Sequence, residues 1–217
     1  MWGHGGNGAE PGQFPVTDRG AIAIADALQQ QHNATLQRLA FWHNQIVDEG
    51  ARAIAQALHH HETLETLELI DNGITDASMQ DFADVLKHNR KLDWLSLAEN
   101  QITDVGATIL ATALRHNTAL YMLDLGRNLI TDVGAQAIAK ALTRNTSLYT
   151  LNLSSNQITI VGAQAFADAL PYNQGLRSLH LSHNPIRRSW QDKIAKLAKD
   201  RNRCTKYPLA IRPIRTL

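Results

Sequence analysis

Six asparagines recur at an interval of 28 residues, and this spacing limits the possible folds of the chain more than any other feature. They are Asn44, Asn72, Asn100, Asn128, Asn156 and Asn184. Apolar residues keep the same interval, so that each unit begins L-x-x-L-x-L-x-x-N-x-I, as in LDWLSLAENQI from Leu92 to Ile102. An interval of this length that repeats without a slip indicates a protein built from stacked units. We therefore expect a solenoid.

The two halves of each unit have different periods. Leu95 and Leu97 alternate with other residues as in a strand, whereas Ala107, Leu110 and Leu114 are spaced for one face of a helix. A threonine before three of the helices is a predicted N-cap, and an aspartate after two of these threonines lies at the positive end of the helix dipole. These threonines are Thr103, Thr131 and Thr159, and the aspartates are Asp104 and Asp132. An asparagine after each of four helices predicts a left-handed residue there, and these are Asn89, Asn117, Asn145 and Asn173.

This pattern resembles the leucine-rich repeat of the ribonuclease-inhibitor type. The phrase N-x-I-T-D-x-G-A is similar to repeats of NOD-like receptors, Ran GTPase-activating proteins and bacterial leucine-rich-repeat effectors, and the resemblance covers residues 16–186. It implies an α/β solenoid, a leucine-rich repeat horseshoe in which a parallel sheet lines the concave side and α-helices cover the convex side. It also implies that each repeated asparagine is structural and bonds loop backbone of its own unit and the next.

Three segments follow from the pattern. Residues 1–13 hold five glycines and are expected to be a flexible N-terminal segment. Residues 14–186 are the repeat domain, with about six full repeats after an N-terminal half repeat, which is either a degenerate cap or a sign that a longer chain has been cut. Residues 187–217 carry ten Lys or Arg against two Asp and are expected to form a basic capping helix and tail.

The side chains between the framework leucines are expected to project from the concave sheet, because successive residues of a strand face opposite sides. Trp and Tyr dominate the hot spots of protein interfaces, and acidic residues among them favour a partner with a basic surface. The alternative is a solvated sheet with incidental aromatic residues. The predicted partner-binding residues are Trp42, Glu68, Ile70, Asp71, Trp94, Glu99, Tyr121, Met122, Asp124, Arg127, Tyr149, Asn152 and His180.

The sequence shows no sign of catalysis. It lacks a phosphate-binding loop, the zinc-protease pattern H-E-x-x-H and the nucleophile pattern G-x-S-x-G. His59, His60 and His61 are interpreted as a surface run that points around a helix end, and Cys204 is a lone cysteine in the basic tail. We therefore expect no enzyme activity, no cofactor and no metal site, and the single cysteine fits a reducing compartment.

Partner classes are limited in the same way. No stretch reaches the ~20 apolar residues that a bilayer crossing needs. The basic C-terminal segment is a solvated cap face, a partner for the acidic concavity, or a contact for nucleic acid or anionic lipid. Nucleic acid is the weakest of these, since no aromatic residues for base stacking are interleaved with the basic ones.

These observations predict a non-catalytic protein–protein interaction module that binds a protein partner on its concave sheet. Resemblance adds the hypothesis of a bacterial effector that acts on a host protein, which places the chain in the cytoplasm or in a host cytosol. Resemblance also leaves the alternative of a small-GTPase regulator, with Arg38 or Arg127 near the nucleotide. The missing first strand leaves a second alternative, a fragment of a larger receptor. The identity of the partner and the oligomeric state stay open.

Overall fold

Strands and helices alternate along the whole repeat region in the computed structural model of the protein, which describes residues 14–30 and 35–187 together with the backbone of residues 210–212. The helices are α1 (Asp18–Gln29), α2 (Asp48–Leu58), α3 (Met79–His88), α4 (Asp104–Leu114), α5 (Asp132–Leu142) and α6 (Ile160–Ala169), and the short 3₁₀ helix η2 (Asp76–Ser78) precedes α3. The strands are β1 (Arg38–Ala40), β2 (Thr66–Glu68), β3 (Trp94–Ser96), β4 (Met122–Asp124), β5 (Thr150–Asn152), β6 (Ser178–His180) and β7 (Ala210–Arg212). The predictions for residues 1–13, for the capping helix after residue 187 and for Cys204 lie outside the described residues.

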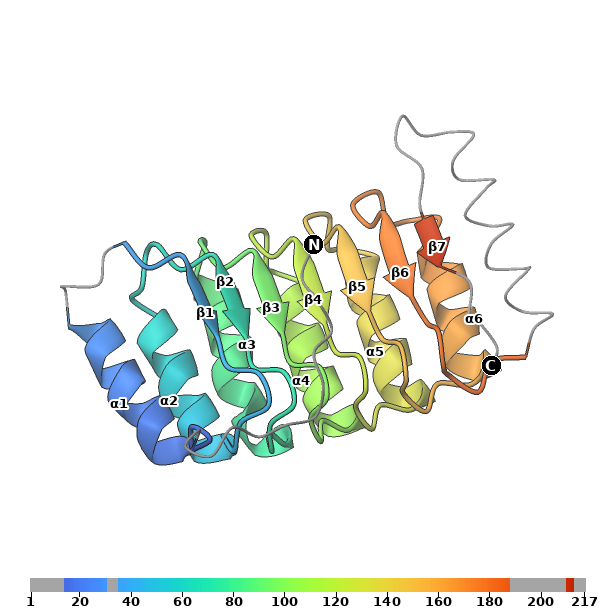
Figure 1. The fold of residues 1–217 in the computed structure, drawn as a ribbon. Coiled ribbons are helices and arrows are strands. Elements are labelled where there is room, and N and C mark those ends of the chain that lie inside the picture. Colours follow the sequence, from blue (N-terminus) through green and yellow to red (C-terminus); the bar gives the residue numbers. More distant parts are fainter. Residues whose placement is uncertain (1–13, 31–34, 188–209, 213–217) are drawn as a thin grey trace, which may run out of the picture.

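The strands form one parallel sheet in the order β1 to β7, and the helices make a second layer beside it (Figure 1). From β1 to β6 each residue pairs with the residue 28 positions further on, as Leu67 does with Leu95. Residues at the same position of successive repeats therefore lie side by side in a row across the sheet. The predicted fold class is confirmed. The tail adds β7, in which Ile211 pairs with Leu179 of β6.

The core lies between the sheet and the helices. Leu67, Leu95 and Leu123 of the strands and Ile138 and Leu142 of the helix α5 are buried there. Burial of one such side chain contributes about 1.5–3 kcal/mol, and the same contacts recur in each repeat. Small residues on the inner helix face, alanines above all, let each helix lie close to the sheet.

The loop asparagines form a ladder of hydrogen bonds between repeats. Asn100 accepts the backbone N–H of Ile74 at 3.1 Å and donates to the carbonyl oxygens of Leu69, at 2.8 Å, and Ala98, at 3.0 Å. Leu69 and Ile74 belong to the preceding repeat and Ala98 to the same one. The structural role expected of these asparagines is confirmed, except that their bonds reach the preceding unit rather than the next.

A second asparagine ladder lies behind the helix ends. Asn145 donates to the carbonyl oxygens of Leu114 and Asn117 in the preceding repeat and accepts the N–H of Leu148 at 2.8 Å. The expected left-handed conformation is wrong: Asn89 is extended, with φ −71° and ψ 133°, and none of the four asparagines has a positive φ. The amide has to reach carbonyl groups of the helix before it, and an extended, buried backbone places it there.

His61 occupies the same row as these asparagines, 28 residues before Asn89. Its side chain is buried, and its Nδ1 accepts the N–H of Leu64 at 3.1 Å. Its Nε2 has no hydrogen-bond partner among the described residues. The interpretation of His59, His60 and His61 as a surface run is therefore wrong for His61, because the repeat register turns this side chain inward.

An aspartate in the first turn of a helix joins it to the next repeat. Asp104 accepts the N–H of Thr131 at 2.8 Å and the N–H of Gly134 at 2.8 Å, and it bonds the Thr131 hydroxyl. The threonine in turn caps its own helix, as predicted, by accepting the N–H of Val133. The same bonds to a glycine recur from Asp18, Asp76 and Asp132, which bind Gly50, Gly106 and Gly162.

Candidate interaction surface

Four large aromatic side chains lie exposed on the sheet side of the molecule. Trp42 and Tyr121 are each 49% exposed, and Trp94 and Tyr149 are each 39% exposed. The helices cover the opposite face of the sheet (Figure 1), and the core is filled by other residues. These aromatic side chains are therefore available for contacts that the fold itself does not use.

Tyr121 and Tyr149 form a stacked pair at the starts of β4 and β5. Their ring centroids are 4.6 Å apart and their planes differ by 12°. Partial desolvation by neighbouring atoms, followed by the adjacent Tyr149, raises the pKa of the Tyr121 hydroxyl. Each ring limits the rotation of the other, so the pair presents a flat, ordered surface with little entropy left to lose on contact.

Glu68 at the end of β2 binds both Arg38 of β1 and Trp42, which follows β1. Its carboxylate accepts from Arg38 Nη2 at 2.6 Å and from Trp42 Nε1 at 2.8 Å, and Arg38 Cζ lies 6.0 Å from the centre of the Trp42 ring. Glu68 is only 3% exposed. Glu68, predicted as a partner contact, therefore lies buried with both carboxylate oxygens bonded inside the molecule, and Arg38 and Trp42 are its bonded neighbours.

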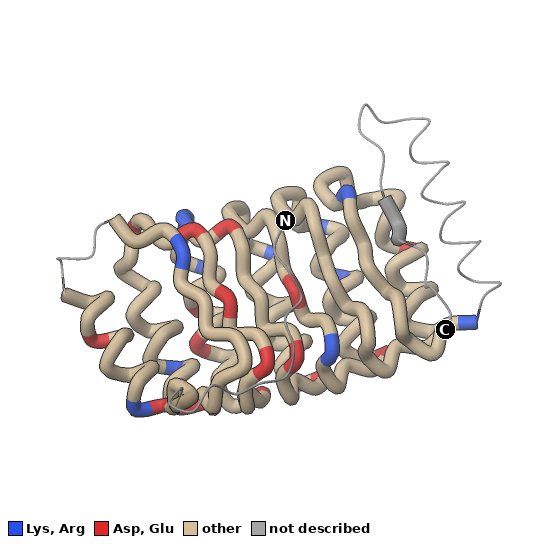
Figure 2. Tube along the Cα trace, viewed as in Figure 1, with Lys and Arg blue, Asp and Glu red and all other residues tan. Residues whose placement is uncertain are grey.

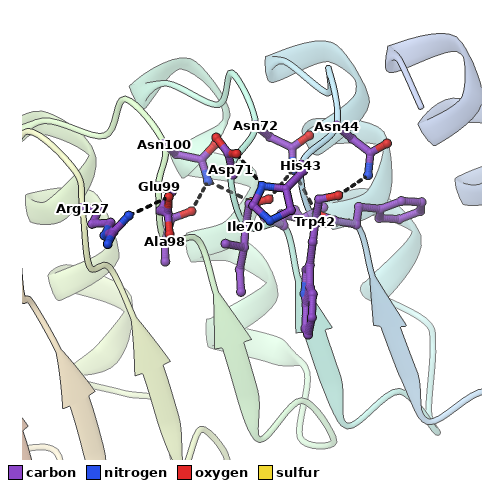
Figure 3. A network of polar contacts seen from close by, with 12 residues as sticks. Trp42, His43, Asn44, Ile70, Asp71, Asn72, Ala98, Glu99, Asn100 and Arg127 are labelled. Atoms are coloured by element: carbon purple, nitrogen blue, oxygen red, sulfur yellow. Dashed lines mark hydrogen bonds and ion pairs between the residues drawn. The ribbon is translucent and has the colours of Figure 1, made fainter. Parts of the chain in front are cut away.

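The loops that follow the strands carry a row of paired charges (Figure 3). His43 Nδ1 lies 2.6 Å from Asp71 Oδ2, and Arg127 donates to Glu99 at 3.2 Å. Every residue of this row has a positive φ between 52° and 58°, and the row is His43, Asp71, Glu99, Arg127, Ser155 and His183. Non-glycine residues rarely adopt this conformation, and here the loop imposes it six times. Asp71 and Glu99, predicted as acidic partner contacts, already have basic neighbours.

Other acidic side chains have no such neighbour. Glu65, Asp93 and Asp124 form no ion pair within the described part of the chain. Partial desolvation and then the charge of Glu65 raise the pKa of the Asp93 carboxyl, although the residue is exposed. Figure 2 shows acidic residues along the part of the sheet formed by β2 to β4. The acidic character of the surface therefore comes from these three carboxylates.

The remaining predicted residues lie on the sheet side and are partly buried. Asp124 accepts the N–H of Gly126 at 2.8 Å, and Asn152 accepts the N–H of Ser154 at 3.0 Å. His180 Nε2 lies 2.7 Å from the Ser178 hydroxyl. The partly buried residues are Ile70, Met122, Asp124, Asn152 and His180.

The structure adds a residue that sequence reasoning did not select. Ser96 lies between Glu68 and Asp124 in the register of the sheet. It is 2% exposed, and its hydroxyl has no hydrogen-bond partner among the described residues. Its place at the centre of a row that also holds two carboxylates was the only signal available from the sequence.

The repeat pattern also matches known families. Two family models described as leucine rich repeat match the chain, one over residues 118–186 and the other over residues 32–55, 60–83 and 88–111. The chain is a leucine-rich repeat protein. Among curated proteins, none matches its sequence.

Several solved leucine-rich-repeat-like folds are similar to this repeat protein. The leiomodin-1 actin-binding site 2 aligns with a TM-score of 0.56 and 19% identity, over 72% of this chain and 91% of that one. The C-terminal domain of tropomodulin from Caenorhabditis elegans aligns with 0.55 and 10%, over 84% and 96%. An internalin from Listeria monocytogenes aligns with 0.50 and 24%, and the match covers 76% of this chain but less than half, 45%, of the internalin. At these identities the likeness extends to the fold alone.

Two features are absent from the described residues. No helix there combines the length and the apolar character needed to cross a bilayer. Nor does this part of the leucine-rich repeat protein bring three or more His, Cys, Asp or Glu side chains together as a metal site.

Proposed function

We propose that this leucine-rich repeat protein is a non-catalytic interaction module that binds a protein partner, with a basic surface, on its concave sheet. The observation that carries the proposal is the exposure of Trp42, Trp94, Tyr121 and Tyr149 on a rigid sheet whose core does not use them. Large aromatic side chains of this kind supply much of the binding energy in protein interfaces. The 28-residue helical unit supports assignment to the ribonuclease-inhibitor type.

The charge of the surface supports a basic partner. Glu65, Asp93 and Asp124 bring three carboxylates to the same half of the sheet, and none has a basic neighbour within ion-pair distance in the described chain. Complementary charge speeds association and rejects partners of the wrong sign.

We propose the cytoplasm as the location, or a host cytosol if the protein is a translocated effector.

The alternative as a GTPase regulator gains no support from the two candidate arginines. Arg38 is bound to Glu68 and Arg127 to Glu99. Actin binding is a property of the leiomodin neighbour, whose matched segment is an actin-binding site. For this chain, an actin partner would be one outcome of the capture experiment below.

The test is affinity capture with the full chain as bait. The double variant Trp94→Ala with Tyr121→Ala is compared with a matched pair at the helix ends, His116→Ala with Tyr172→Ala, whose side chains are also exposed. Removal of a hot-spot aromatic costs about 2 kcal/mol or more, so the first variant should lose at least about tenfold in affinity for the captured partner. Equal retention of every partner by both variants would refute binding on the concave sheet.

A further inference from the structure

Ser96 presents a buried hydroxyl that the described chain leaves without a partner. Ser96 alternates with Leu95, which points into the core, so the serine side chain faces the concave side with Trp94 on the same strand. A buried polar group without a hydrogen bond costs about 1–3 kcal/mol. A group of a bound partner that donates to this oxygen would recover that loss.

Asp124 lies opposite Ser96 on the next strand and keeps an uncompensated charge. Its Oδ1 accepts one backbone N–H, from Gly126, and it has no ion pair among the described residues. Glu68, on the other side of Ser96, differs in that Arg38 and Trp42 already occupy both of its oxygens. The donor that fits beside Ser96 is therefore a cation directed to Asp124.

The first two strands show which cation such a surface accepts. There a guanidinium group lies beside an indole ring and binds a carboxylate of the adjacent strand, in Arg38, Trp42 and Glu68. On β3 and β4 the indole of Trp94 and the carboxylate of Asp124 are both present, but neither strand contains an arginine.

We propose that Trp94, Ser96 and Asp124 form a receptor for one arginine side chain of the protein partner. This rests on the function proposed above, and it specifies the chemistry recognised at the centre of the sheet. The indole face stacks on the guanidinium plane, and the N–H groups of the guanidinium donate to Asp124 and to the Ser96 hydroxyl. Lysine fits less well, since its ammonium is a point charge that cannot stack while it donates to two separated acceptors.

The test uses the full chain with indole nitrogens labelled and short capped peptides as probes. Gly-Gly-Arg-Gly-Gly is compared with the same peptide carrying lysine or citrulline, which keeps the shape of arginine without its charge. The arginine peptide should shift the Trp94 indole signal in a saturable way. The lysine peptide should bind about tenfold more weakly, and the citrulline peptide should leave the signal unchanged.

Two variants of the proposed receptor and one control variant separate a binding role from a structural one. Asp124→Asn should weaken arginine binding by about tenfold or more, whereas Asp26→Asn on the exposed side of α1 should not change it. Ser96→Ala should weaken binding by about threefold or more while its urea unfolding midpoint stays equal or rises, because an unpartnered hydroxyl has been removed. A structural serine would show the opposite, with a lower midpoint and unchanged binding.

The outcomes distinguish this inference from the function on which it rests. Equal shifts with the arginine and citrulline peptides, or full binding by Asp124→Asn, would overturn the receptor. If the capture experiment then still depends on Trp94 and Tyr121, concave binding stands and only the arginine receptor is lost. If neither experiment depends on these residues, both proposals fail.

Discussion

Asp104 and Gly134 connect consecutive repeats by a contact that only glycine permits. A Cβ atom at residue 134 would lie 2.7 Å from Asp104 Oδ1 and 2.9 Å from Ala107 Cβ. The rows of Asp and Gly therefore depend on one another. Ser78 supports this, because it replaces the glycine in one repeat, where the 3₁₀ helix η2 takes the place of the first α-helical turn.

Gly134→Ala should destabilise the protein by about 1–3 kcal/mol, since the added methyl group overpacks the junction between α4 and α5. The measurement is the free energy of unfolding in urea. Gln136→Ala, two residues further along the same helix and exposed, is the control and should stay within about 0.5 kcal/mol of the parent. A Gly134→Ala protein as stable as the control would mean that the junction is looser than these distances imply.

Asn145→Ala should cost about 3 kcal/mol or more, because it leaves the buried N–H of Leu148 and the carbonyl of Leu114 without their partner. Thr146→Ala, at the exposed neighbouring position, should change the unfolding free energy little. Similar losses in the two variants would show that the second asparagine ladder contributes nothing beyond local loop structure.

His61→Asn should stabilise the protein by about 1 kcal/mol, since it removes a buried ring nitrogen without a partner and restores the side chain found in four other repeats. The reciprocal change, Asn89→His, should destabilise it, because Asn89 donates to Leu58 and His61 and accepts from Leu92. Thermal or urea unfolding of both variants checks the pair. The prediction is lost if the two substitutions act in the same direction.

Asp93 should make stability fall as the pH rises. Partial desolvation and the charge of Glu65 raise its pKa above the ordinary 3.8, so the folded state holds the proton more tightly than the unfolded state does. Its contribution is thus fully present below pH 3.8 and is lost as the pH rises through the higher, folded-state pKa. Asp93→Asn should flatten this part of a stability profile measured in urea between about pH 3 and pH 7.

The pKa of the Asp84 carboxyl is shifted in the opposite direction from that of Asp93. A hydrogen bond from Lys87 lowers the pKa of the Asp84 carboxyl, so its contribution is present above the ordinary pKa and is lost as the pH falls through the lower, folded-state value. Asp84→Asn should therefore reduce stability at neutral pH, and only slightly, because the pair lies near the surface. For Asp93, a stability profile of Asp93→Asn identical to that of the parent would show that folding does not raise the pKa of the Asp93 carboxyl.

The rows of the repeat could be predicted because one physical rule governs each of them. Leu95 and Leu123 had to face the core, and Ala107 and Leu110 had to lie on one helix face, since alternation and helical spacing admit no other arrangement. The threonine caps followed from local backbone chemistry in the same way. The exposed position of Trp94 followed from the alternation along its strand.

Features that depend on neighbouring repeats were harder to predict. Asn89 was assigned by its tolerance of a left-handed backbone, whereas contacts with the preceding helix decide its conformation. The burial of Glu68 depends on Arg38 and Trp42, which lie 30 and 26 residues away. The unpartnered hydroxyl of Ser96 could be identified only from the positions of its neighbours on β2 and β4. None of these contacts is encoded in the local pattern.

The constant register of the sheet makes the length of the molecule adjustable. Since each strand meets the next at an offset of 28 residues from β1 to β6, removal or duplication of one whole unit would join surfaces of the same shape. Such a change would alter the span of the concave face in steps of about 4.8 Å, the distance between neighbouring strands. A change in the number of repeats can therefore fit this scaffold to partners of different size while both terminal units keep their sequences.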